Sequence, residues 1–83
     1  MRLGKIEKFK LATGKRLRSY RQSLGLNVIS FSRKIKISQG TLSELENGIS
    51  APSAYTLANL CQYTDIDIAW LLAGKGKKTW SPR

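Results

Sequence analysis

Residues 26–48, with the sequence LNVISFSRKIKISQGTLSELENG, constrain the fold of this chain more than any other stretch. Asn27 is a suitable N-cap, because its carboxamide can accept a hydrogen bond from an unpaired amide in the first turn of a helix. Leu26 before it and Phe31 after it are spaced to form a hydrophobic staple across that turn. The pattern predicts a helix over residues 28–34.

The same pattern repeats immediately afterwards. Ser38 takes the place of the cap, Ile37 and Leu42 take the places of the staple, and a second helix is predicted over residues 39–46. Only three residues remain to connect the two helices. The Asn-Gly pair that follows ends the second helix, since both residue types tolerate left-handed backbone angles.

A tight two-helix unit in a small basic chain favours one class of function. The chain carries 15 lysine and arginine residues against 5 acids, a formal net charge of +10 over 83 residues, and such an excess favours a polyanionic partner. Eleven of the basic residues lie in residues 2–36 and four in residues 75–83, while residues 37–74 have none. A solvated basic surface kept for solubility is the alternative. Two short helices joined this tightly fit a helix-turn-helix that reads nucleic acid.

Length and composition argue against several other classes. Eighty-three residues make one domain with short loops and several helices. One cysteine and no histidine leave almost nothing for a disulfide framework, a metal site or an activated nucleophile, so we expect no enzyme, no metal and no cofactor. No apolar run approaches the roughly 20 residues of a membrane span, and the N-terminal sequence lacks the apolar block of a signal peptide. The expected location is the cytoplasm of a bacterial or phage-infected cell, on the nucleoid when bound.

Four segments connect the chain to a known family. GKRLRSYRQSLGLN, ISQGTLSELENG, PSAYTLANL and DIAWLLAG stand in the order and spacing of the Cro and phage-repressor type of helix-turn-helix domain, which the chain resembles over residues 13–74. The resemblance implies an all-α fold, a compact lambda-repressor-like domain of five helices in which helices 2 and 3 form the helix-turn-helix. Residues 1–12 would then be a basic N-terminal arm or an extra helical segment, and residues 75–83 a basic flexible tail or linker.

The other helices are predicted from their caps. Thr13 can cap a helix that Gly25 ends, Ser53 can open the fourth helix, and Asp67 can cap a short fifth helix that Gly74 ends. The inner face of the fourth helix is expected to hold Ala54, Leu57, Leu60 and Cys61. Cys61 is interpreted there as a small core residue.

The helix predicted over residues 39–46 has one face free for a ligand. Leu42 and Leu45 are spaced to face the core. The candidates for base reading on the other face are Gln39, Gly40, Ser43 and Glu44. Gln39 is the strongest, because a carboxamide can donate and accept together against adenine N6 and N7. A glycine at position 40 lowers the stability of the helix by about 1 kcal/mol relative to alanine. Either close approach to DNA or an easier start of the helix would explain why a glycine is present. Glu44 can accept from cytosine N4, or it is only a solvent-exposed glutamate.

Phosphate contacts are predicted from basic charge, helix N-termini and the family's geometry. The candidates are Arg16, Arg18, Arg21, Asn27, Val28, Ser38, Thr41, Asn47 and Ser50. In the family, the loop at NGISAP lies along a phosphate strand and often carries basic residues, which this chain lacks there. Val28 stands where the family commonly has a phosphate-binding glutamine, so only its backbone amide could serve.

Two further roles rest on the resemblance. In the family, the arginine at the Arg21 position pairs with the glutamate at the Glu46 position beneath the surface, beside a DNA phosphate. From sequence alone these two residues could equally be unrelated surface charges. Lys36 occupies the family's usual glycine in the turn, which predicts a positive φ and strain at this lysine.

The expected function is sequence-specific binding of double-stranded DNA by a transcriptional regulator of the phage-repressor type. Trp70 and Leu71 are too apolar for a free surface helix, so they are candidates for contact with a second subunit or for the core. A homodimer would place two Gln39 helices in successive major grooves of a roughly palindromic operator. Two alternatives stay open, a protein-interaction adaptor that uses the uncharged surface of residues 37–74 and a binder of RNA or anionic surfaces driven by the basic ends.

Overall fold

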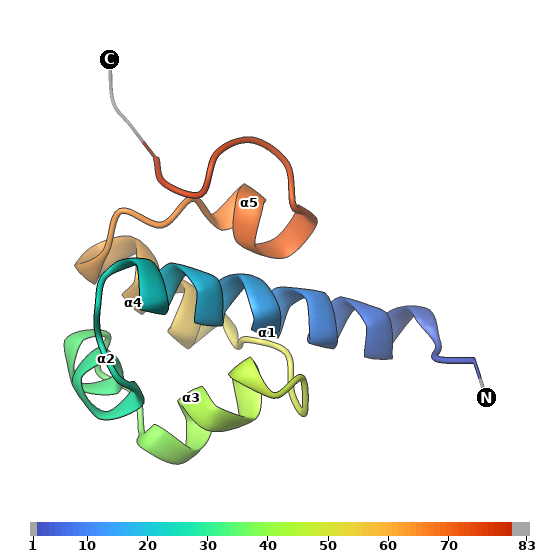
Figure 1. Cartoon of the computed structure of the whole chain (residues 1–83), viewed down its shortest axis with the longest axis horizontal. Coiled ribbons are helices and arrows are strands. Elements are labelled where there is room, and N and C mark those ends of the chain that lie inside the picture. The colour runs from blue at the N-terminus through green and yellow to red at the C-terminus, as the bar shows by residue number, and fades with distance from the viewer. Residues whose placement is uncertain (1, 81–83) are drawn as a thin grey trace.

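The computed structural model of the chain describes residues 2–80 as an all-helical fold. Five helices follow one another, α1 (Lys5–Ser23), α2 (Val28–Lys34), α3 (Gln39–Glu46), α4 (Ala54–Tyr63) and α5 (Ile68–Ala73). Figure 1 shows α1 crossing the molecule, with α2 and α3 on one side, α5 on the other, and the first turns of α1 projecting beyond the rest. The predicted five-helix architecture is confirmed.

The local signals in residues 26–48 act as predicted. Asn27 Oδ1 accepts from the backbone N–H of Ser30 at 2.8 Å, so α2 begins directly after this cap. Ser38 Oγ accepts from the backbone N–H of Thr41 at 3.0 Å and starts α3 in the same way. Lys36, in the turn between the helices, has a φ of 62°, which confirms the predicted left-handed conformation.

One core joins the five helices. α1 packs against both α3 and α5, and α2 packs against α3. The buried core side chains are Leu17, Tyr20, Phe31, Ile35, Leu42, Leu45, Leu60, Ile66 and Leu71. Burial of Leu42 and Leu45 confirms the inward face predicted for α3 and leaves the other face of that helix to solvent.

α1 is longer than the sequence predicted. The expected N-cap at Thr13 is wrong, because the helix begins at Lys5 and Thr13 lies inside it with only 3% of its surface exposed. The backbone N–H of Gly4 donates to Glu7 Oε1 at 2.8 Å and starts the helix. The residues between this start and Thr13 are mostly strong helix formers, so the segment before Thr13 is helical from Lys5 onwards.

The inward face of α4 also differs from the prediction. Thr56, Asn59 and Leu60 are buried, whereas Cys61 is exposed, so the assignment of Cys61 to the core is wrong. Asn59 can be buried because its Nδ2 donates to the backbone carbonyl of Ile35 at 3.0 Å, which offsets the loss of water. Since Ile35 is the C-cap of α2, this bond ties α4 to the helix-turn-helix.

The segment after α5 is more ordered than predicted. It folds back antiparallel to the link between α4 and α5. The backbone N–H of Asp67 donates to the carbonyl of Lys78 at 2.9 Å, and that of Trp80 donates to the carbonyl of Asp65 at 2.7 Å. The prediction of a flexible tail over residues 75–83 is therefore wrong for the part that ends at Trp80, and the rest lies outside the described residues.

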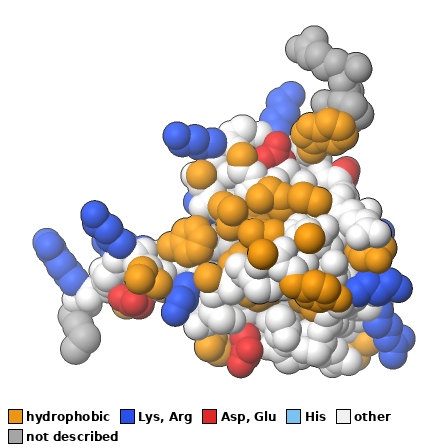
Figure 2. All heavy atoms as spheres, turned by 180° about the vertical axis from the view of Figure 1, so that it is seen from behind, with side chains coloured by type: hydrophobic (Ala, Val, Ile, Leu, Met, Phe, Trp, Pro, Cys, Tyr) orange, Lys and Arg blue, Asp and Glu red, His pale blue; other side chains and the backbone are white. Residues whose placement is uncertain are grey.

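Hydrophobic side chains gather on the back of the molecule, over α4 and α5 and towards the projecting end of α1 (Figure 2). Leu71 is fully buried in the core, which removes it from the predicted dimer contact. Trp70 is half-buried, and Lys78 Nζ lies 5.6 Å from the centre of its ring. Within residues 2–80, no helix is both long enough and apolar enough to cross a membrane.

Candidate nucleic-acid interface

The solvent-facing side of α3 holds the four residues predicted to read bases. Gln39, Gly40, Ser43 and Glu44 are all exposed, and together they form the α3 outer face. Residues four apart lie above one another on a helix, so Gln39 and Ser43 share one row and Gly40 and Glu44 the next. This face carries no positive charge, and its carboxamide, hydroxyl and carboxylate groups can donate and accept hydrogen bonds.

Gly40 has no structural reason to be a glycine within the described chain. A Cβ placed on Gly40 would meet no other atom within 4 Å among the described residues. Glycine in a helix is unfavourable relative to alanine by about 1 kcal/mol. The open space in front of Gly40 is therefore consistent with a ligand that approaches the backbone closely.

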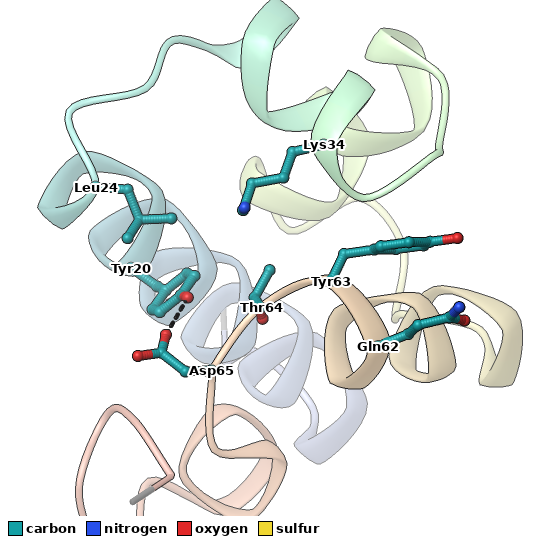
Figure 3. Close-up of a pocket in the computed structure, with 7 residues that line it drawn as sticks. All are labelled: Tyr20, Leu24, Lys34, Gln62, Tyr63, Thr64 and Asp65. Atoms are coloured by element: carbon teal, nitrogen blue, oxygen red, sulfur yellow. Dashed lines mark hydrogen bonds between the residues drawn. The ribbon is translucent and has the colours of Figure 1, made fainter.

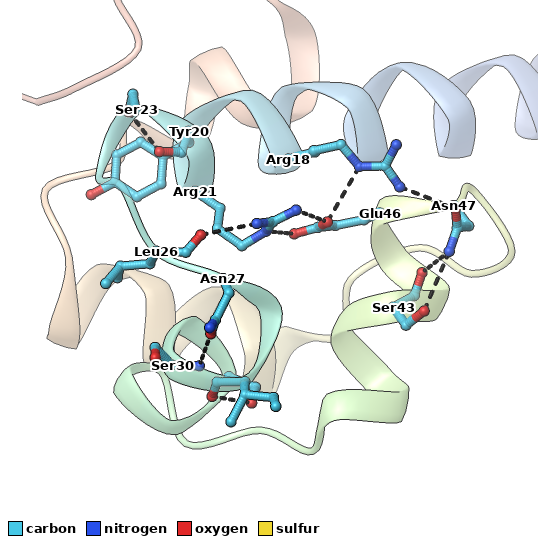
Figure 4. Close-up of polar contacts among 12 residues, drawn as sticks. Arg18, Tyr20, Arg21, Ser23, Leu26, Asn27, Ser30, Ser43, Glu46 and Asn47 are labelled. Carbon is cyan, nitrogen blue, oxygen red and sulfur yellow. Dashed lines mark hydrogen bonds and ion pairs between the residues drawn. The ribbon is translucent and has the colours of Figure 1, made fainter.

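A buried ion pair connects α3 to α1. Arg21 Nε donates to Glu46 Oε2 at 2.7 Å, and Arg21 Nη2 donates to Glu46 Oε1 at 2.9 Å (Figure 4). The Glu46 side chain is 2% exposed and that of Arg21 is 12% exposed. Arg21 Nη1 also donates to the carbonyl of Leu26 at 2.9 Å, so this arginine connects α1, α3 and the start of the helix-turn-helix.

The positive charge of Arg21 is present over the ordinary pH range. The hydrogen bonds to Glu46 raise the pKa of Arg21 above its already high ordinary value, and burial opposes them only in part. The guanidinium is thus always protonated. Because most of its N–H donors are used inside the protein, Arg21 has few left for a phosphate.

A glycine makes the close crossing of α1 and α3 possible. A Cβ placed on Gly14 would overlap the carbonyl oxygen of Leu45 and come within 2.8 Å of that of Glu46. Real Cβ atoms do not approach carbonyl oxygens that closely, so only glycine fits here. The crossing at Gly14 sets how near the end of α3 lies to α1.

Arg18 stands at the edge of the same junction. Its Nε lies 3.4 Å from Glu46 Oε1, its Nη2 donates to Asn47 Oδ1 at 3.1 Å, and its side chain is 44% exposed. A guanidinium has five N–H donors, and the others have no partner among residues 2–80 and can face a phosphate. Asn47 in turn donates from Nδ2 to the carbonyl oxygen of Ser43 at 2.8 Å and to Ser43 Oγ at 3.3 Å.

Arg16 lies apart from these residues. Its Nη1 donates to the carbonyl of Leu71 at 3.0 Å, near the C-terminal end of α5, where helix carbonyls lack partners within the helix. Three arginines that looked equivalent in sequence thus occupy three settings: Arg21 is inside the α1–α3 junction, Arg18 is at its edge, and Arg16 faces α5.

The remaining phosphate candidates lie at helix N-termini and in the loop after α3. Asn27 and Ser38 are caps, and Val28 is the first residue of α2. Ser38 Oγ donates to Thr41 Oγ1 at 2.8 Å, which leaves the Thr41 hydroxyl hydrogen free to point outward. Ser50 is half-buried in the loop that follows α3.

A hollow of about 410 Å³ opens on another part of the surface (Figure 3). Its lining residues are Tyr20, Leu24, Lys34, Gln62, Tyr63, Thr64 and Asp65. The Tyr20 hydroxyl donates to Asp65 Oδ1, and burial, followed by this hydrogen bond, raises the pKa of Tyr20 above its ordinary value. The lining includes no residue of α3 and none that was predicted to contact DNA, so the hollow is not part of the candidate interface.

The sequence interpretation missed two residues that hold the interface in place. Gly14 was not singled out, because a glycine inside a helical pattern gives no sign of what lies across from it. Asn59 was also missed, although a polar carboxamide in the apolar run of α4 was a usable signal. Both act through carbonyl oxygens at the ends of α3 and α2.

A helix-turn-helix family model matches residues 17–71 of the chain. The match starts inside α1 and ends inside α5, so it contains α2, α3 and α4 entire and leaves the projecting part of α1 outside. No curated protein and no solved structure matches the chain.

Proposed function

The chain belongs to the Cro and phage-repressor type of helix-turn-helix family and is a DNA-binding transcription regulator; on that premise we propose that it represses transcription by occupying an operator as a homodimer. It would act in the cytoplasm of a bacterial or phage-infected cell. In this proposal α3 enters the major groove and α2 crosses the phosphate backbone.

The observation that carries the proposal is the exposed α3 outer face, which has no positive charge and is held against a basic helix. Side chains that donate and accept hydrogen bonds distinguish base edges, whereas lysine and arginine attract any phosphate. Gln39 supplies a carboxamide for adenine, and Glu44 supplies an acceptor for cytosine N4. Arg18, with free donors beside the end of α3, is positioned for a flanking phosphate.

The dimer is supported by the apolar surface at the back of the molecule. Trp70 on α5 is half-buried, and exposed alanines flank it on the same short helix. Hydrophobic side chains gather over α4 and α5 (Figure 2), and apolar patches of this kind mark association sites. Two copies joined there would present their α3 helices to successive major grooves, about 34 Å apart.

Selection from random duplex DNA tests the whole proposal. The full chain is mixed with random fragments at moderate salt, and the bound fragments are sequenced over several rounds. We expect a roughly two-fold symmetric site with half-sites about one helical turn apart. Enrichment of a single half-site would contradict the dimer, and the absence of any enriched sequence would contradict sequence-specific binding. Equal binding to single-stranded RNA would favour a binder driven by the basic ends.

A further inference from the structure

Asn47 lies between α1 and the α3 outer face, and both ends of its carboxamide are in use. Oδ1 accepts from Arg18 Nη2 at 3.1 Å, while Nδ2 donates to the Ser43 carbonyl at 2.8 Å and to Ser43 Oγ at 3.3 Å (Figure 4). A guanidinium can only donate and a carbonyl oxygen can only accept. These two neighbours therefore fix which end of the carboxamide is the oxygen, and the reverse orientation would place like groups against each other.

The fixed carboxamide determines what the Ser43 hydroxyl can do. A free serine hydroxyl rotates and can either donate or accept a hydrogen bond. In this structure Asn47 Nδ2 donates to Ser43 Oγ, so the hydroxyl hydrogen must point to another acceptor. Ser43 is exposed on the α3 outer face, and that hydrogen is available to a ligand.

Given the proposed function, on which this inference rests, we infer that Asn47 is a positioning residue that fixes Ser43 as a hydrogen-bond donor towards a base edge. The acceptors available in the major groove are purine N7, guanine O6 and thymine O4, whereas adenine N6 and cytosine N4 are donors. A serine hydroxyl held as a donor favours the acceptor atoms and disfavours the amino groups, which are donors themselves. Asn47 thus contributes to sequence choice without touching a base.

The same geometry revises the expected role of Asn47. It was predicted to contact a phosphate, but its amino group already faces two oxygen atoms of Ser43. Arg18 keeps free N–H donors and is 44% exposed, so it is the better phosphate ligand of the two. A phosphate on Arg18 would also stabilise the guanidinium that holds Asn47 Oδ1, which links phosphate docking to the orientation of Ser43.

The test uses the operator obtained by selection and a set of duplexes in which each base pair is replaced in turn. Kd is measured for the full-length wild type, Ser43→Ala, Asn47→Ala and the double variant. We expect Ser43→Ala to lose about tenfold of the preference at one base pair, the equivalent of about one hydrogen bond. Asn47→Ala should lose most of the preference at that same base pair, and the double variant should lose no more than Ser43→Ala alone.

Gln62→Ala, which truncates an exposed carboxamide on α4 outside the candidate interface, is the matched control and should leave that preference unchanged. Thermal unfolding of each variant shows that binding is measured on folded protein, and a loss of stability alone would not alter the preference at a single base pair.

Uniform loss of affinity on all duplexes with Asn47→Ala would overturn the inference and make Asn47 a phosphate ligand. Independent, additive effects of the two substitutions would overturn it as well. If the wild type prefers no sequence, both the inference and the proposed function are wrong. If the wild type has a sequence preference and Asn47→Ala keeps it, only the inference is wrong.

Discussion

Residues 37–74 contain no lysine or arginine, whereas residues 2–36 contain eleven. The first region includes the α3 outer face, whose exposed side chains are neutral or acidic. The second region consists mainly of α1, whose exposed turns bear lysines on a helix that projects beyond the domain (Figure 1). In the proposed function the two regions have different tasks, because discrimination between bases requires directed hydrogen bonds and affinity for the duplex requires positive charge.

The two regions meet where α1 crosses the end of α3. Arg21 and Arg18 in the basic region contact Glu46 and Asn47 in the region without basic residues, and Gly14 allows the backbones to come this close. These few contacts fix the position of the α3 outer face relative to the charges of α1. Substitutions at the junction should therefore have larger effects on stability than substitutions within either region.

The largest expected effect is that of Glu46→Gln at this junction. Removal of the carboxylate leaves the buried Arg21 guanidinium without its counter-charge, and the free energy of unfolding should fall by about 3 kcal/mol. Chemical denaturation of the two proteins measures this difference. Glu44→Gln is the matched control, since Glu44 is exposed on the same helix and its substitution should change stability by about 0.5 kcal/mol or less. Similar values for the two variants would mean that the pair does not join the regions.

The next largest difference in stability is expected between Gly14→Ala and Gly40→Ala. Gly14→Ala would force α1 and α3 apart, and overpacking of this kind costs about 1–3 kcal/mol. Gly40→Ala has open space and should instead stabilise the helix by about 1 kcal/mol. Melting temperatures of the two variants should therefore move in opposite directions. A rise in both would show that the helices can separate at no cost.

Lys36→Gly should have a smaller effect on stability than Glu46→Gln or Gly14→Ala. Lys36 is the last basic residue before residues 37–74 and has a φ of 62°, which strains a residue with a Cβ. Glycine should raise the free energy of unfolding by up to about 1 kcal/mol. Loss of the contact between Lys36 Nζ and the Tyr63 ring offsets part of this gain. Lys34→Gly, at the last residue of α2, should destabilise by up to about 1 kcal/mol and serves as the control. A lower melting temperature for Lys36→Gly would contradict the strain.

The parts of the fold that depend on neighbouring residues were predictable from the sequence. The caps at Asn27 and Ser38 determine the starts of α2 and α3 through bonds that span three positions. The positive φ of Lys36 was expected from the resemblance, because the family usually has a glycine at this place in the turn. Hydrophobic spacing was enough to place Leu42 and Leu45 in the core, and hence to turn the α3 outer face to solvent.

The parts that depend on distant residues were not predictable. Thr13 has the chemistry of an N-cap, but the packing of α1 buries it inside a longer helix. Cys61 was assigned to the wrong side of α4, and the burial of Asn59 was missed because its partner is the carbonyl of Ile35 at the end of α2. The role inferred for Asn47 depends on the crossing of α1 and α3, which no local pattern in the sequence describes.

The most direct test of the division between the two regions is a salt titration of Gln39→Ala. The association constant of wild type and variant is measured on the selected operator and on unrelated DNA over a range of salt concentrations. We expect the variant to lose about 1–3 kcal/mol on the operator only, with the slope of log K against log salt unchanged, because no phosphate contact is lost. Equal loss on both DNAs, or a slope smaller by about 0.9, the value for one phosphate contact, would show that Gln39 holds the backbone and does not read a base.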